Sequence, residues 1–121
     1  MAAVFKVKLT ILKGSTFSQL VTWKTGDPAT PVDLTGCTAR MQIRSDIDSP
    51  DVLAEFTTEN GGIELGGTDG TIRYGIMTAT ETAAIDWEGG TYDLEIVFAD
   101  DVTVQKKIKG AVVVVPEVTR D

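Results

Sequence analysis

Asp46, Asp48 and Asp51 stand close together in the chain and form its most suggestive group of metal ligands. Calcium prefers several carboxylate oxygens brought together by a flexible segment, and this spacing offers them. The glycine and the bidentate glutamate that complete a calcium loop do not follow in register. We therefore interpret residues 46–51 as a solvated loop and keep calcium binding as the alternative.

Residues for catalysis are scarce. The chain has no histidine, so it lacks the commonest general base and the commonest metal ligand. Its one cysteine, Cys37, has no histidine or second cysteine to activate it, and we expect it to be a buried structural residue. Asp93, Glu95, Asp100 and Asp101 could supply paired carboxylates for glycoside hydrolysis, but no aromatic groove accompanies them. The sequence predicts no enzyme and no cofactor.

Charge and hydropathy limit the partners. Eleven basic and eighteen acidic residues give a net charge of −7, the wrong sign for binding a phosphate backbone. The longest uniformly apolar run, residues 111–115, is far shorter than the roughly 20 residues that span a bilayer. Residues 1–5 show no basic and then apolar pattern of a secretion signal. We expect a soluble protein that binds neither nucleic acid nor membrane.

The elements that position these residues are strands, because apolar and polar residues alternate along most of the chain. The predicted strands are residues 5–11, 17–23, 38–44, 52–57, 63–65, 71–76, 92–98, 102–109 and 111–115. Five lysines fall within them, and we expect all five on the solvent face. They are Lys6, Lys8, Lys106, Lys107 and Lys109. Thr78 and Glu81 have the spacing of a capping box and predict one short helix.

These elements predict an all-β fold, and the length of 121 residues suits one domain over residues 1–121. Many short strands at regular intervals are typical of an antiparallel sandwich or barrel. We favour a two-sheet antiparallel sandwich of the immunoglobulin-like kind. Parallel pairing is not expected, because the chain has no crossover helices.

Two local motifs are predicted to organise this sandwich. In the box Asp33, Leu34, Thr35 and Gly36, we expect a polar side chain to fold a turn, Gly36 to take a positive φ and Leu34 to fill the core. Tyr92 begins a strand after a short crossover. Immunoglobulin-like sandwiches keep a tyrosine there whose hydroxyl bonds to the upstream backbone, and a plain core-edge residue is the alternative.

The terminal run of residues 111–115 is apolar on both faces of its predicted strand. Val112 and Val114 point one way, whereas Val113 and Val115 point the other. One interpretation is a central strand whose second face is covered by the crossover around Trp87 or by a loop. The other is that Val113, Val115 and the edge beyond Pro116 meet a neighbouring subunit.

Several short sequence boxes follow one another in a fixed order across nearly the whole chain. They are residues 13–17, 32–36, 41–44, 60–63, 70–72, 78–84, 90–96 and 110–120. In this order they resemble small structural proteins of tailed bacteriophages, in particular the amino-terminal domain of baseplate upper proteins. The resemblance implies an immunoglobulin-like sandwich built into the virion, near the tail tip, baseplate or fibre attachment.

Two classes of function follow. A virion structural protein, made in the host bacterial cytoplasm, would bind other virion proteins and assemble into a homo-oligomer. Within this class, a capsid decoration or head–tail connector protein is an alternative to a tail protein. The other class is a carbohydrate- or calcium-binding sandwich module. A defined ring in solution favours the first class, and ligand binding by a monomer favours the second.

Overall fold

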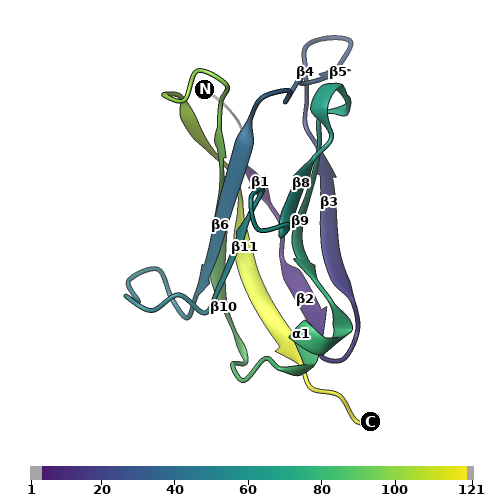
Figure 1. The fold of residues 1–121 in the computed structure, drawn as a ribbon, viewed down its shortest axis with the longest axis vertical. Helices are drawn as coiled ribbons and strands as arrows, with labels where there is room; N and C mark the ends of the chain where they lie inside the picture. Colours follow the sequence, from purple (N-terminus) through teal and green to yellow (C-terminus); the bar gives the residue numbers. More distant parts are fainter. Residues whose placement is uncertain (1–3, 120–121) are drawn as a thin grey trace.

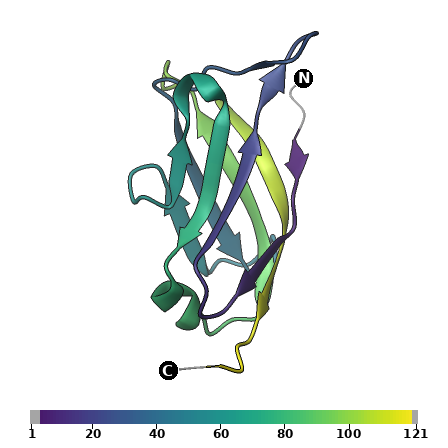
Figure 2. The ribbon, with the colours of Figure 1, turned by 90° about the vertical axis from the view of Figure 1, so that its right-hand side faces the viewer.

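Two β-sheets face each other in the computed structural model, which describes residues 4–119 (Figure 1, Figure 2). The larger sheet has the strand order β1-β11-β10-β6-β7, and β2 also pairs with β11. Its strands are β1 (Phe5–Lys6), β2 (Leu9–Leu12), β6 (Thr38–Arg44), β7 (Ala54–Thr57), β10 (Gly89–Val97) and β11 (Val104–Val115). The smaller sheet has the order β3-β9-β8, formed by β3 (Phe17–Thr22), β8 (Ile63–Leu65) and β9 (Thr71–Met77). This confirms the all-β sandwich.

The core lies between the two sheets and follows the predicted alternation. Along β6 and β10, every second residue is buried, and Ile72 and Tyr74 of β9 face them from the other sheet. The alternation predicts ten core residues, of which seven are buried and three, Phe5, Val7 and Phe98, are partly buried. The buried seven are Leu9, Met41, Ile43, Ile72, Tyr74, Leu94 and Ile96. The period-two pattern therefore identified the inner faces correctly.

The predicted capping box forms. Thr78 Oγ1 accepts a hydrogen bond from the Glu81 amide at 3.1 Å, and Glu81 Oε1 accepts one from the Thr78 amide at 2.8 Å. The helix that follows, α1 (Ala79–Ala83), is a short one. Its buried Thr82 hydroxyl donates to the Ser15 carbonyl at 2.8 Å and accepts from the Gly14 amide at 3.0 Å. Thr82 thus joins the helix to the turn between β2 and β3.

Two small elements lie outside the predicted strands and helix. A two-stranded ribbon pairs β4 (Lys24–Thr25) with β5 (Thr30–Pro31), and a 3₁₀ turn, η1 (Gly67–Asp69), follows β8. Each is too short for hydrophobic periodicity to reveal.

The purely antiparallel arrangement was wrong at one edge. β1 and β2 run parallel to β11, with Phe5 opposite Ile108 and Leu9 opposite Val112. Parallel neighbours need a long connection, and here nearly the whole sandwich lies between β2 and β11 in the chain. The absence of crossover helices excludes parallel pairing only for strands that are close in sequence.

The breaks between strands also differ from the prediction at two places. The predicted strand 5–11 is interrupted after β1, where the Val7 carbonyl accepts a hydrogen bond from the Tyr92 hydroxyl at 2.6 Å. The predicted strands 102–109 and 111–115 join into one strand, β11, which runs through Gly110. Because Gly110 has no side chain, the Val7 carbonyl can approach the backbone of β11 at this point.

Lys107 was expected on the solvent face but is buried, with 2% of its surface exposed. The register between β10 and β11 shifts after Leu94, so that Lys107 is the extra residue of a β-bulge and points inward. Its ammonium lies 3.8 Å from the centroid of the Trp23 ring. Burial lowers the pKa of Lys107. The inward direction of Lys107 cannot be predicted from strict alternation, because one inserted residue exchanges the two faces of the strand that follows it.

Candidate protein interaction surface

The Asp33, Leu34, Thr35 and Gly36 box forms the predicted turn. Asp33 Oδ1 accepts a hydrogen bond from the Thr35 amide at 2.9 Å, Gly36 has a φ of 81°, and Leu34 is 1% exposed. Hydrogen bonding to Thr35 lowers the pKa of Asp33. The box is therefore a structural turn that inserts a leucine into the core.

Tyr92 is buried and its hydroxyl does bond to the upstream backbone, but not as a tyrosine corner would. It donates to the carbonyl of Val7, 85 positions away in the chain, and lies 3.0 Å from the Tyr74 hydroxyl. Tyr74 belongs to the smaller sheet and Val7 to the edge of the larger one. Tyr92 therefore joins the two sheets and fixes the β1–β2 edge instead of bracing its own crossover.

The two buried tyrosines give a prediction for alkaline pH. Burial raises the pKa of Tyr74, and burial followed by the neighbouring Tyr74 hydroxyl raises the pKa of Tyr92. The folded chain therefore holds these protons above the unfolded value of about 10, so their contribution to stability is full below that pH and declines above it. These are the only two tyrosines in the sequence.

We therefore expect no phenolate absorbance near the usual tyrosine pKa while the chain stays folded. Ultraviolet absorbance and circular dichroism, followed together as pH rises, should change in one common transition. A tyrosine that ionises near pH 10, at about its ordinary pKa, while the dichroism remains native would contradict the buried pair.

The three candidate calcium ligands are not brought together. The Asp46 carboxylate accepts from the Asp48 amide at 2.9 Å, and the Asp51 amide donates to Ser49 Oγ at 3.3 Å. Within residues 4–119, no group of three or more aspartate, glutamate or cysteine side chains is placed to hold a metal ion. The aspartates instead shape the loop between β6 and β7.

Cys37 and Asp100, which were also candidates for chemistry, both have structural contacts. Cys37 is partly buried against the core, and burial is the main cause that raises the pKa of its thiol. Asp100 accepts hydrogen bonds from the Val102 and Thr103 amides at 2.8 Å and from Thr103 Oγ1 at 2.7 Å. These bonds lower the pKa of Asp100, with Thr103 as the main cause, and close the hairpin between β10 and β11.

The end of β11 combines features of both interpretations of the terminal run. The strand is internal, since it pairs with β10 on one side and with β1 and β2 on the other. Val112 and Val114 are buried, but Val113 and Val115 are each 38% exposed. Trp87 packs against the core. Pro116, directly after the strand, is exposed as well.

A further apolar residue, Leu12, belongs to the same surface. It lies opposite Val115 on β2 and is 51% exposed. We call Leu12, Val113 and Val115 the β2–β11 patch. Sequence reasoning missed Leu12 because the predicted strand ended at residue 11. Continuing the alternation by one residue would have placed Leu12 beside Thr10 on the solvent face.

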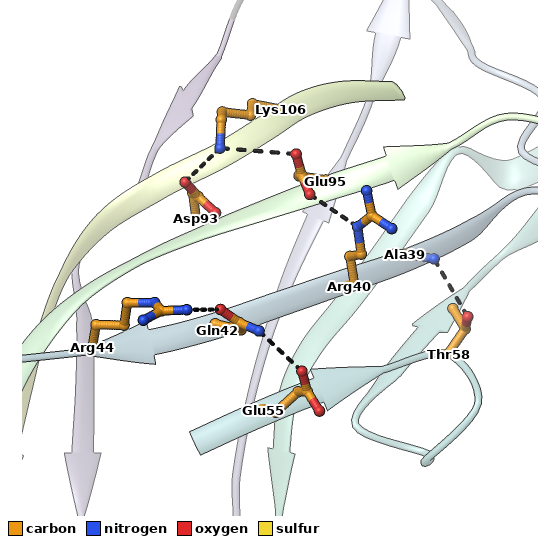
Figure 3. Close-up of polar contacts among 9 residues, drawn as sticks. All are labelled: Ala39, Arg40, Gln42, Arg44, Glu55, Thr58, Asp93, Glu95 and Lys106. Carbon is orange, nitrogen blue, oxygen red and sulfur yellow. Dashed lines mark hydrogen bonds and ion pairs between the residues drawn. The ribbon is translucent and has the colours of Figure 1, made fainter. Parts of the chain in front are cut away.

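Farther along the same outer face, the larger sheet is strongly charged (Figure 3). Lys106 bonds to Asp93 at 2.8 Å and lies 3.8 Å from Glu95, which also pairs with Arg40 at 2.9 Å. The pKa of Lys106 is raised, chiefly by its hydrogen bond to Asp93. Exposed ion pairs contribute only about 0–1 kcal/mol each to stability. We therefore expect these ion pairs to affect the choice of binding partner more than the stability of the fold.

Two comparisons with known proteins find nothing: no family model and no curated protein matches the chain. Solved structures do resemble it. One, from photo-crosslinking analyses of the multimeric cell-adhesive interactions of VGSC beta subunits, is 10% identical, with a TM-score of 0.45 and coverage of 91% of this chain and 92% of that one. Another holds extracellular domains 3–5 of Drosophila OTK, at 14% identity and a TM-score of 0.37.

The OTK match covers 88% of this chain but only 32% of the solved OTK chain, so this chain spans about a third of the length of that solved chain. Likenesses at these identities and TM-scores say nothing about the function of this chain. Its own strand pairing shows an all-β sandwich of two facing sheets. Within residues 4–119, no helix has the length and apolarity to cross a membrane.

Proposed function

We propose that this chain is a non-enzymatic structural component of a tailed bacteriophage virion, in the tail, baseplate or fibre-attachment apparatus. It binds copies of itself and other virion proteins through its surface. The ordered sequence boxes support the placement in a virion. The β2–β11 patch supports binding to proteins.

The β2–β11 patch carries the proposal because it places three apolar side chains on the outside of two paired strands. Leu12, Val113 and Val115 expose 51%, 38% and 38% of their surfaces. Contiguous exposed apolar side chains on a sheet are typical of a protein contact, since burying them in a partner removes them from water.

Capsid decoration and head–tail connection would use the same patch and differ only in the place of assembly. The carbohydrate- or calcium-binding alternative makes a different prediction, because an isolated monomer would then bind the ligand. Calorimetry with calcium and a glycan array therefore separate the two classes. Mass photometry measures the size of the oligomers, and the virion proposal predicts oligomers of one defined size.

Changing Val113 and Val115 together to threonine should separate assembly from folding. Threonine keeps the β-branched shape that suits a strand and replaces an exposed methyl group with a hydroxyl. We expect the chain to stay folded, with its free energy of unfolding changed by less than about 1 kcal/mol, because both side chains are exposed. Sedimentation velocity at micromolar concentration should show assemblies smaller than those of the wild type.

Val104→Thr is the matched control, because Val104 is 42% exposed at the other end of β11. The control should leave assembly unchanged. Oligomers of unaltered size in the Val113→Thr, Val115→Thr variant would overturn the patch as the interface. A large loss of stability in that variant would show that its outer face is covered within the chain.

A further inference from the structure

A groove of about 720 Å³ runs over the outer face of the larger sheet and collects basic side chains. Four basic residues line it, namely Lys6, Arg44, Lys106 and Lys109, together with the acidic residues Asp93 and Glu95. The groove is thus net positive on a chain whose net charge is −7. Exposed Ile47, in the loop between β6 and β7, forms part of its rim.

The two carboxylates that line the groove pair with Lys106 and Arg40 and with none of its other basic residues. Lys6 and Lys109 are direct neighbours on β1 and β11, and like charges opposite each other on adjacent strands are destabilising. Lys109 also lies opposite Asp93, but the Asp93 carboxylate binds Lys106. No ion pair forms at Lys6 or Lys109 within the described residues. A carboxylate placed between these two lysines would relieve their repulsion.

Arg44 adds a third positive charge to the groove. Its guanidinium donates to the Ser49 carbonyl and to Gln42 Oε1, each at 2.8 Å, and both acceptors are neutral. Figure 3 shows the bond to Gln42. Hydrogen bonds to neutral oxygens orient the side chain and leave its charge available. The groove therefore presents three cations, held by β1, β6 and β11, that form no ion pair within the described residues.

We propose that this groove binds an acidic loop of a second copy of the chain, the tip of the hairpin between β10 and β11. The inference rests on the proposed function, because it names a contact through which copies assemble. Asp101 of the tip enters between Lys6 and Lys109. Val102 beside it packs toward Ile47 on the rim.

The hairpin tip fits this groove in both charge and hydropathy. Asp100 is occupied by the hydrogen bonds that close the hairpin, whereas the exposed Asp101 makes no side-chain bond within residues 4–119. Val102 is 81% exposed and Ile47 is 87% exposed. A carboxylate next to an exposed valine complements cations next to an exposed isoleucine.

The two halves of the contact lie at different places on one molecule. The hairpin forms the upper end of the larger sheet, whereas the loop that carries Ile47 projects near its lower end (Figure 1). Tip and groove are different surfaces, so the contact is head-to-tail. Head-to-tail contacts generate rings when the rotation closes and filaments when it does not.

Charge exchange tests the contact directly. Lys109→Glu and Asp101→Lys should each weaken assembly about tenfold or more in sedimentation velocity, because each places like charges together. Mixing the two variants should restore assembly, since every tip then meets a groove of opposite charge. Raising the salt concentration should weaken the wild-type assembly, because exposed charges are screened.

Lys24→Glu is the control for net charge, because Lys24 is exposed and lies on β4, away from the groove. It should leave assembly intact. Asp101 has a φ of 60°, which lysine adopts poorly, so Asp101→Asn supplies a second variant that tolerates this backbone. Asparagine should also weaken assembly, by removing the charge.

The experiments distinguish a failure of this contact from a failure of the proposed function. Oligomers that persist in Lys109→Glu and in Asp101→Asn would overturn this contact and leave the proposed function standing. A wild-type chain that stays monomeric at micromolar concentration and at low salt would overturn both. Mixed variants that remain separate would show that the two charges do not meet.

Discussion

Replacing Leu34 with alanine should lower the free energy of unfolding by about 2–5 kcal/mol. Leu34 is 1% exposed and enters the core from the turn before β6. Its backbone is held on both sides, since its amide donates to the Gly67 carbonyl at 2.8 Å and its carbonyl accepts from the Cys37 amide at 3.0 Å. The turn therefore cannot collapse into the cavity, and we expect a cost in the upper part of the range.

Urea unfolding followed by tryptophan fluorescence measures this change as a shift of the midpoint at unchanged slope. Leu20→Ala is the matched control, because Leu20 lies on edge strand β3 and is 46% exposed. It should cost much less than Leu34→Ala. Equal losses in the two variants would contradict the role of Leu34 as a core residue of the turn.

Features that depend on near neighbours in the chain were predicted well from the sequence. The alternation along β6 and β10 identified the buried faces, because the side-chain period of a strand is fixed by its geometry. The Asp33 turn and the Thr78 capping box also formed as predicted. Their hydrogen bonds join residues two or three positions apart, so the spacing of a few residue types is sufficient.

Features that depend on distant partners were not predictable in this way. The parallel edge at β1 and β2, the inward turn of Lys107 and the break at Val7 each arise where β11 meets another strand. A bulge reverses the inside and outside faces of a strand without any local signal in the sequence. The sequence of β11 looks the same whether or not the bulge is present.

The candidate interaction surface also combines features that the sequence predicts with features that depend on distant partners. The sequence indicated that Val113 and Val115 form a second apolar face, but whether another element covers that face is a tertiary property. The basic groove was beyond sequence reasoning, because its lysines and arginine come from β1, β6 and β11. Those strands become neighbours only after folding.

Replacing Gly110 with alanine should destabilise the chain, although alanine is larger than glycine by only one methyl group. Gly110 has no positive φ among the described backbone angles, so alanine suits its conformation and would ordinarily strengthen a strand. Its methyl group, however, would overlap the Val7 carbonyl, a backbone group that cannot rotate away. That carbonyl also accepts the Tyr92 hydroxyl, and the Val7 amide donates to the Lys109 carbonyl at 2.9 Å.

We therefore expect Gly110→Ala to cost about 1–3 kcal/mol through overpacking, and more where the Tyr92 hydrogen bond is broken. Gly61→Ala is the control, because open space surrounds Gly61 and its φ of 81° makes the backbone the only source of cost, about 1–2 kcal/mol.

Hydrogen exchange distinguishes the two mechanisms. The Val7 amide should lose protection in Gly110→Ala and keep it in Gly61→Ala, because only the first substitution pushes β1 away from β11. A Gly110→Ala chain as stable as the wild type, with Val7 still protected, would show that the β1–β11 edge has room for a side chain and that Tyr92 does not depend on this close approach.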